Sequence, residues 1–353
     1  MLTSGMAILT ENGMTQIEIE HPVSVFDELG KVNYFGWARS DLFNFNSDLI
    51  WTPRRLITES ERFMVFTQTH LFIFEINDSG LLGWLNIAAV SLIDKKISIK
   101  NEIIPFPMGG LELSSSGSLI QIKIKKSLIE FISLEDGNKI LKIDINDMSH
   151  NNRLRGEVVL FKPDNAQALS VNLPLQRREE CFQLLCSSPW YEVEGVMQFE
   201  NVDILLSKRR AWGIHESIRL ARSPNYIHFC ATGCGFQNGR QIGFYLGYGI
   251  ADSSGTTENA FFVNGIIHKL EKVIFKISDY DTALPWHFTT TDSRLDMNFQ
   301  PVQKNMLRKY FLFSSLRLRQ EYGFFSGKVT LDNGSILRFR NVTGIAERLK
   351  STN

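Results

Sequence analysis

The sequence predicts an all-β fold built from two tandem antiparallel barrels with few, short helices. Asn-Gly or Asp-Gly pairs begin at residues 136, 238, 264 and 333, each between runs of alternating apolar and polar residues, which is typical of tight hairpins. No segment longer than about three turns has a helical period, and Ser207–Ala221 comes nearest to one. Closure into up-and-down barrels is the usual way to hide the edges of such a meander, and a large β-sandwich is the alternative.

The first half of the chain contains a series of expected strands. Each ends at turn residues such as Asn77–Gly80 or Glu135–Asn138. The expected strands are Phe63–Ile76, Leu81–Leu92, Leu119–Lys125, Ile129–Leu134, Lys139–Ile145, Gly156–Phe161 and Ala168–Leu173.

The second half is organised around Thr232–Lys269, which reads as two hairpins joined by the polar loop Asp252–Asn259. Further strands are expected at Val273–Ile277, Arg294–Phe299, Phe311–Leu318 and in a last hairpin over Gly327–Arg340.

We expect the boundary between two domains near residue 190. Pro174–Ser188 resembles a connecting segment, because the charge cluster Arg177–Glu180 interrupts the alternation. The predicted division is a lead-in segment over residues 1–20, one barrel-like domain over 21–189 and a second over 190–353.

Composition places the chain among globular proteins. It has 353 residues, 43% hydrophobic and 22% charged, enough for two domains with cores of their own. Lys plus Arg and Asp plus Glu are both 38, so no global field favours nucleic acid. The first residues have neither the basic start nor the apolar core of a signal peptide, and no window approaches the ~20 apolar residues of a spanning helix. We therefore expect a cytoplasmic location.

Motifs for metals and cofactors are incomplete. The four cysteines form two close pairs, Cys181 with Cys186 and Cys230 with Cys234; neither is C-x-x-C, and buried thiols are favoured over a zinc site. His215-Glu216 begins like the zinc signature H-E-x-x-H, but position 219 is Arg. Gly233, Gly235 and Gly239 are spaced one residue too far apart for a dinucleotide fingerprint, so no metal or cofactor is predicted.

An ordered series of short motifs in the second half carries a family resemblance, which fits over residues 182–349. A weaker similarity lies in Phe26-Asp27, Gly30–Asn33 and Gly36–Arg39. The chain resembles a bacterial family described as domain of unknown function 2804. The matching residues are Gly239–Phe244, Gly255–Ala260, Val263–Gly265, Pro285-Trp286, Arg294–Asp296, Phe299–Pro301, Gln320, Tyr322-Gly323, Gly344 and Glu347.

The resemblance implies a fold similar to lipocalin-like double-barrel proteins, which include carotenoid hydratases and tocopherol cyclase. Those enzymes add water or a hydroxyl across a double bond of a long apolar substrate. The chain departs from the family at Ser207–Gly213, where an Asp-Trp-x-Arg-Gly element is expected. Fold similarity alone does not assign that activity.

Glu258 is the candidate catalytic residue, with Asn259 beside it. Both begin a strand after a polar loop, so a carboxyl group and an amide could point into a barrel mouth; the alternative is that they close their own loop. Trp286 could stack on a ligand, with His287 as a titrating neighbour, or could be a core residue beside a solvent-facing His.

Further candidate ligand-binding residues are Gln320, Arg294 and Glu347, polar residues within or beside expected strands. The alternative for this group, which also includes Asp296, is an outward-facing salt bridge.

These features favour a protein that binds a small apolar or amphipathic molecule in an aromatic-lined barrel cavity. The alternative is a cofactor-free hydratase, cyclase or isomerase acting on an apolar, isoprenoid-like or lipid-like substrate. Glu258 would then transfer the proton while Asn259 and Gln320 orient the substrate.

Overall fold

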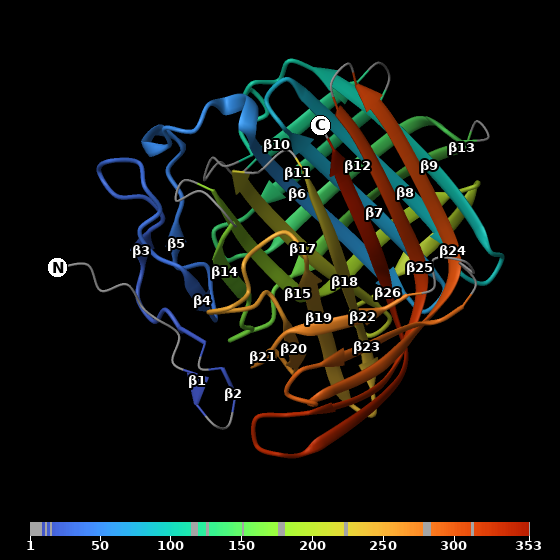
Figure 1. Cartoon of the computed structure of the whole chain (residues 1–353). Helices are drawn as coiled ribbons and strands as arrows, with labels where there is room; N and C mark the ends of the chain where they lie inside the picture. The colour runs from blue at the N-terminus through green and yellow to red at the C-terminus, as the bar shows by residue number, and fades with distance from the viewer. Residues whose placement is uncertain are drawn as a thin grey trace.

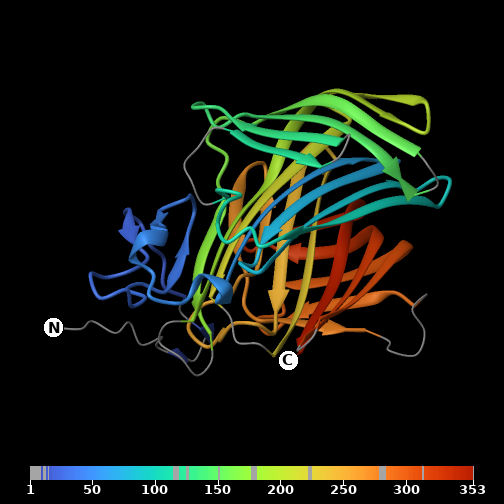
Figure 2. The same ribbon diagram turned by 90° about the horizontal axis from the view of Figure 1, so that it is seen from above.

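In the computed structural model the chain forms two large antiparallel sheets, the N-sheet and the C-sheet (Figure 1). The structure describes residues 9–10, 13–14, 16–113, 119–124, 127–149, 152–175, 181–221, 225–277, 284–311 and 314–352. Viewed from above, both sheets are curled and lie against each other (Figure 2). The predicted all-β fold with two barrel-like antiparallel units is confirmed.

Within these residues the N-sheet has 13 strands and the C-sheet nine. The N-sheet strands, in spatial order, are β10 (Leu119–Ile124), β11 (Ser127–Ser133), β12 (Lys139–Met148), β13 (Asn152–Phe161), β15 (Phe182–Phe199), β17 (Ala211–Ala221), β6 (Ile57–Thr67), β7 (His70–Asp78), β8 (Leu82–Ser91) and β9 (Lys96–Pro105). Strands β14 (Leu169–Pro174) and β16 (Val202–Leu206) also pair with β15, and β4 (Gly36–Ala38) pairs with β14. The C-sheet strands are β21 (Ile266–Lys269), β20 (Ala260–Val263), β19 (Arg240–Tyr248), β18 (Tyr226–Gln237), β26 (Ile336–Thr352), β25 (Ser314–Thr330), β24 (Leu295–Phe311), β23 (Trp286–Thr290) and β22 (Val273–Lys276).

Small elements precede the N-sheet. They are the strand pairs β1 (Leu9–Thr10) with β2 (Gly13–Met14) and β3 (Val23–Ser24) with β5 (Phe43–Asn44), and the 3-10 turns η1 (Ser47–Leu49) and η2 (Arg54–Leu56). No helix in the described ranges is both long and apolar enough to cross a membrane.

The Asn-Gly turns form as their chemistry predicts. Asn238 and Gly239, between β18 and β19, have φ of 51° and 77°, and Asn264 and Gly265, between β20 and β21, have φ of 50° and 77°. Two successive positive φ values define the type I′ turn, whose twist matches that of the flanking strands.

Two local predictions were wrong, Phe63–Ile76 as a single strand and Pro174–Ser188 as a connecting segment. Phe63–Ile76, expected as one strand, contains the end of β6 and most of β7, because the Thr67 hydroxyl accepts the backbone N–H groups of Thr69 and His70 and so closes a turn without Gly or Pro. Ser207–Ala221, the segment that comes nearest to a helical period, contains strand β17, in keeping with the all-β prediction.

The expected connecting segment, Pro174–Ser188, is strand β15 from Phe182 onward; its charge cluster, residues 177–180, lies outside the described residues. The change from N-sheet to C-sheet comes between β17 and β18. A domain boundary near residue 190 stays a prediction.

Apolar clusters fill each sheet and also join the two. Phe63 and Val65 of β6 pack within the N-sheet, whereas the intervening Met64 belongs to an apolar cluster that also contains Tyr322 and Ile345 of the C-sheet. A strand places successive side chains on opposite faces, so β6 serves the core of its own sheet and the interface alternately. A fully buried side chain of this size contributes about 1.5–3 kcal/mol.

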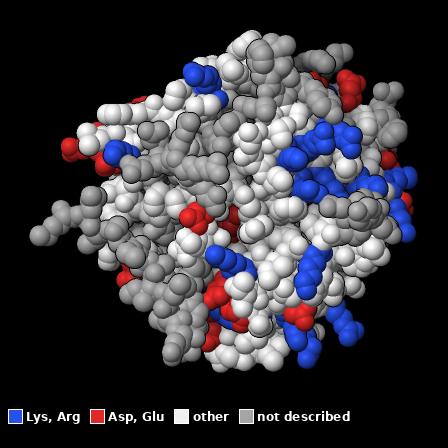
Figure 3. All heavy atoms as spheres, viewed as in Figure 1, with Lys and Arg blue, Asp and Glu red and all other residues white. Residues whose placement is uncertain are grey.

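The neutral net charge is unevenly distributed. Arg308 of β24, Arg317 of β25 and Lys350 of β26 lie directly opposite one another. Figure 3 shows Lys and Arg side chains gathered where β24 and β25 lie in Figure 1. Like charges in this arrangement destabilise a sheet slightly.

Candidate functional site

A row of charged side chains crosses the interface face of the N-sheet. Glu75 of β7 lies opposite Arg62 of β6, and Arg62 lies opposite Glu216 of β17. Arg62 is 7% exposed and Glu216 is 1% exposed. Charged side chains are almost never buried to this extent unless they are paired, so this row indicates a specialised site.

A second polar row crosses the facing side of the C-sheet. Asn305 of β24, Gln320 of β25, Glu347 of β26 and Cys230 of β18 occupy consecutive cross-strand positions. Gln320 donates to Glu347 Oε1 at 2.7 Å, and its own Oε1 accepts from Asn305 at 3.0 Å. The amide therefore holds the carboxylate in one orientation.

Arg62 joins the two rows. Its Nε and Nη2 donate to Glu216 Oε2 at 2.9 and 2.5 Å, and its Nη1 donates to Glu347 Oε2 across the sheet interface. Burial alone would lower the pKa of Arg62, but the two carboxylates raise it well above its usual value. Burial alone would raise the pKa of Glu347, but Arg62 and the Gln320 amide bring it below its usual value. Arg62 and Glu347 are therefore both charged at neutral pH.

Glu75 behaves differently from Glu347. Asn77 and Asn86 donate to its two oxygens at 3.1 and 3.4 Å, yet burial raises the pKa of Glu75 more than Arg62 lowers it. The site thus combines a carboxylate kept ionised with a carboxyl group biased towards its protonated form. Such divergence between neighbouring acids is characteristic of sites that transfer protons.

Glu258 continues the C-sheet row. Gly247 lies opposite Cys230, and a Cβ at Gly247 would come within 2.3 Å of the Glu258 carboxyl carbon, so only glycine leaves room for this side chain. Glu258 is 3% exposed; Gln183 donates to its Oε2 at 2.5 Å, and His228 Nε2 lies 3.2 Å from its Oε1.

A cavity of about 120 Å³ lies between the two rows, and we name it the interface cavity. Apolar side chains from both sheets line this cavity. Glu258 contacts two of the lining residues, Gln183 and His228, and Tyr245 is a third polar residue of the lining. The lining residues are Thr58, Ser60, Arg62, Glu75, Asn77, Trp84, Asn86, Gln183, Glu216, Ile218, Leu220, Tyr226, His228, Cys230, Tyr245, Ile250, Leu307, Leu316, Leu318, Glu347 and Leu349.

Unpartnered polar atoms concentrate at this cavity. Within the described part of the chain, four lining residues each have a buried oxygen without a hydrogen-bond partner: Asn86 Oδ1, Gln183 Oε1, Glu216 Oε1 and Tyr245 Oη. Burial, together with the charge of Glu258, raises the pKa of Tyr245 well above its usual value, so its phenol remains a donor. Buried polar atoms normally have partners, so this group is suited to a polar ligand atom or to water.

The residues predicted from the sequence divide into two groups. Glu347 and Gln320 belong to the polar row of the C-sheet, and Glu258 contacts Gln183 of the cavity lining. Asn259 closes its own loop: its Oδ1 accepts from the Gly247 N–H at 2.8 Å and its Nδ2 donates to the Glu271 carbonyl at 3.0 Å.

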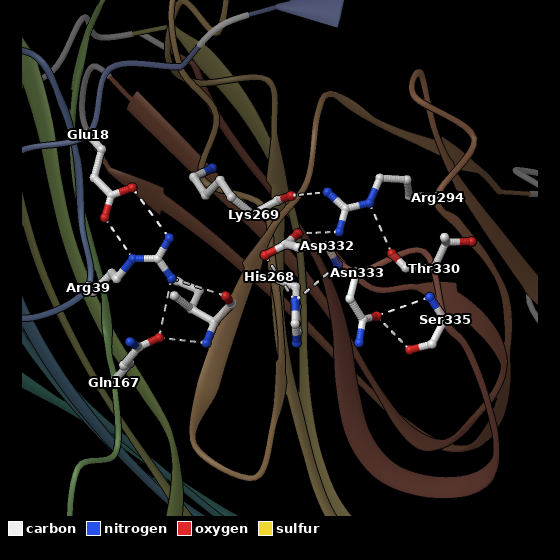
Figure 4. Close-up of polar contacts among 11 residues, drawn as sticks. Glu18, Arg39, Gln167, His268, Lys269, Arg294, Thr330, Asp332, Asn333 and Ser335 are labelled. Atoms are coloured by element: carbon white, nitrogen blue, oxygen red, sulfur yellow. Dashed lines mark hydrogen bonds and ion pairs between the residues drawn. The ribbon is translucent and has the colours of Figure 1, made fainter.

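Trp286 and Arg294 lie away from the cavity. Trp286 is 1% exposed and packs against Phe288 and Phe299 in the C-sheet core, while His287 makes a 2.9 Å contact with Asp296. Figure 4 shows Arg294 binding the carbonyls of Lys269 and Thr330 and the carboxylate of Asp332, which ties three segments together.

The remaining motifs find structural places. His215 and Glu216 point to opposite faces of β17, and the four cysteines are free thiols. Among the described residues, no group of three or more His, Cys, Asp or Glu side chains is arranged to hold a metal ion.

Sequence reasoning missed Arg62, Glu75 and His228. The available signal was a single charged residue within an otherwise apolar run of sequence, as at Glu75 between Phe74 and Ile76. Only the register, which places Glu75 opposite Arg62, shows that these charges meet.

Two curled antiparallel sheets with a cavity at their interface define a lipocalin-like double-barrel protein. The chain belongs to the family described as Domain of unknown function (DUF2804), whose model matches residues 16–352. This confirms the resemblance seen in the second half and extends it over most of the chain.

Solved structures show the same fold at low sequence identity. Kievitone hydratase from Nectria haematococca is 9% identical with a TM-score of 0.54, the match covering 82% of this chain and 88% of that one. CghA, solved with Sch210972, is 9% identical with a TM-score of 0.50, covering 85% and 89%. A search of curated proteins gave no match.

Proposed function

We propose that the protein binds a small apolar or amphipathic molecule in the interface cavity. The observation that carries this proposal is the set of four unpartnered oxygens on residues that line a cavity with apolar side chains. Small-molecule sites typically combine a mostly apolar wall with a few fixed polar groups that orient the ligand.

The cavity volume bounds the ligand. About 120 Å³ is similar to the engineered apolar cavities of ~150 Å³ that admit benzene. We therefore expect one ring or a short branched chain with a hydroxyl or carbonyl group to fit.

The test uses a panel of small terpenoid alcohols and ketones, with the protein's own co-purifying molecules identified by native mass spectrometry. Ile218 lines the cavity, so Ile218→Phe should fill it and abolish the thermal shift given by the best ligand. The matched control is Ser217→Phe on the next position of β17, outside this lining. A ligand that still stabilises Ile218→Phe would contradict the proposal.

A second candidate function is cofactor-free hydration, cyclisation or isomerisation of an apolar substrate. Glu75 favours it, because a carboxyl group with a raised pKa in an apolar cavity can donate a proton to an alkene. In a hydration, that proton would form a new C–H bond, water would add to the resulting cation, and the proton released from the added water would return to the Glu75 carboxylate, which restores the acid. The same fold holds a hydratase, which supports the class of reaction only by analogy.

Two variants distinguish catalysis from binding. Glu75→Gln and Glu258→Gln should each reduce turnover of a panel alkene by orders of magnitude, with ligand affinity near wild type. Products are followed by the mass increase of one water. If both variants turn over substrate at the wild-type rate, or no alkene is converted, the catalytic candidate fails and binding alone remains.

A further inference from the structure

A second cavity, of about 490 Å³, lies on the opposite side of β6 and β17, and we name it the N-sheet cavity. Glu216, Ile218 and Leu220 of β17 line the interface cavity, whereas the alternate residues His215, Ser217 and Arg219 line the N-sheet cavity. The two spaces are therefore separated by the thickness of one sheet, and their linings share no residue.

The size and the aromatic wall suit a ligand larger than the interface cavity admits. A volume of about 490 Å³ falls within the ~300–1,000 Å³ typical of small-molecule sites. Phe63 stacks on Phe131 at 4.5 Å between ring centroids and on the His215 ring at 4.4 Å. Phe43, Phe45 and Tyr191 also line the space.

One ion pair in this cavity is already complete. Glu61 Oε1 accepts from Arg219 at 2.7 Å, and Glu61 Oε2 lies 2.6 Å from His215 Nε2. Burial lowers the pKa of His215, which is therefore neutral at physiological pH. Burial also raises the pKa values of Cys186 and Tyr191, so the thiol and the phenol carry no charge.

The remaining charges leave the cavity electropositive. Its basic side chains are Lys139, Lys162 and Arg219 and its acidic side chains are Asp41 and Glu61, so the basic groups outnumber the acidic ones by one. Burial lowers the pKa of Lys139 and raises the pKa of Asp41, and a bound carboxylate beside Lys139 would favour its charged form. Lys139 Nζ donates to Ser133 Oγ at 2.9 Å. Among the described residues, neither Lys139 nor Lys162 makes an ion pair with a carboxylate. An aromatic cavity with two available ammonium groups and one excess charge is complementary to a single anion.

We propose that the N-sheet cavity binds an amphipathic carboxylic acid, with its aromatic or aliphatic body against Phe63 and Phe131 and its carboxylate at Lys139 and Lys162. This site is independent of the function proposed for the interface cavity.

The test measures binding of phenylbutyrate, and of the uncharged phenylbutanol, by isothermal titration calorimetry. We expect the acid to bind about tenfold or more tightly than the alcohol, the range given by a hydrogen bond to a charged group. Lys139→Met should remove that preference. The control, Lys142→Met, lies on the outer face of the same strand, where it pairs with exposed Glu157 at 3.4 Å, and should bind like wild type.

Neighbouring positions on β17 locate the site. Ser217→Phe should abolish phenylbutyrate binding, and Ile218→Phe should preserve it, with urea unfolding used to confirm that both variants fold. Equal affinity for acid and alcohol, or unchanged binding in Lys139→Met, would overturn the proposal. Loss of binding in Ile218→Phe with retention in Ser217→Phe would place the acid in the interface cavity and also overturn it.

Discussion

Replacing Arg62 by methionine leaves two buried carboxylates, Glu216 and Glu347, without the cation between them. In the folded protein the guanidinium donates to Glu216 at 2.9 and 2.5 Å and also to Glu347. Removing one partner of a buried ion pair costs about 3–5 kcal/mol, because an uncompensated charge stays buried. We therefore expect Arg62→Met to lower the free energy of unfolding at neutral pH by about that amount.

The loss should depend on pH. Arg62 holds the pKa of Glu347 below 4.5, so its stabilising contribution is present above that pH and is lost as the pH falls through the folded value. In Arg62→Met, the Gln320 amide still donates to Glu347 but the cation that opposed burial is gone, so this pKa rises and protonation of Glu347 relieves the buried charge at mildly acidic pH. The difference between wild type and variant should therefore shrink between neutral pH and about pH 5.

Urea unfolding followed by tryptophan fluorescence measures both effects. Arg153→Met is the matched control, since Arg153 and Asp144 form a 2.6 Å pair with side chains 49% and 43% exposed. An exposed pair contributes about 0–1 kcal/mol, so this variant should barely move the unfolding midpoint. Arg62→Met with Glu347→Gln should recover part of the loss. A loss below about 1 kcal/mol in Arg62→Met, or one equal at both pH values, would refute the reasoning.

Two further predictions concern other parts of the chain. Although burial would raise the pKa of Glu61, Arg219 and His215 lower it to about 2. The free energy of unfolding of the wild type should therefore fall by about 3 kcal/mol as the pH drops from 4.5 through 2. In urea unfolding, Glu61→Gln should show a weaker dependence of stability on pH over this range. Gly265→Ala should lower the thermal midpoint more than Gly239→Ala: both glycines have φ of 77°, but a Cβ at 265 meets Ala166 at 3.2 Å and one at 239 meets nothing within 4 Å. Equal midpoints would contradict the second expectation.

Local chemistry predicted the hairpins, because a type I′ turn needs residues that tolerate positive φ. Asn238-Gly239 and Asn264-Gly265 supply those residues wherever the rest of the chain lies. The turn after Thr67 escaped prediction because a side-chain hydroxyl closes it, and hydroxyls are common in strands.

The sequence of β17 does not alternate cleanly, because both of its faces are partly buried. Trp212 and Ile214 pack at the interface, but His215, Ser217 and Arg219 line a cavity on the other side, so polar and apolar residues mix. A strand with one solvent-exposed face and one buried face has regularly alternating polar and apolar residues, whereas a strand that lies between two cavities does not.

The candidate site could be predicted only in part. Gln320 and Glu347 were candidates because they are polar residues within expected strands, and both lie in the polar row of the C-sheet. Arg62 and Glu75 were missed because their significance depends on register and on a sheet formed from the other half of the chain. Trp286 lies in the C-sheet core beside a half-buried histidine, His287.

Because side chains alternate along β6 and β17, mutations on these strands can change the interface cavity and the N-sheet cavity separately. At residues 58–63 and 215–220, the lining residues at even positions belong to the interface cavity and those at odd positions to the N-sheet cavity. A substitution library restricted to the even positions, or to the odd ones, would vary the lining of one cavity and leave the lining residues of the other unchanged. By contrast, inserting a single residue in either strand would exchange the contents of both compartments, placing Arg62 or Glu216 among the phenylalanines.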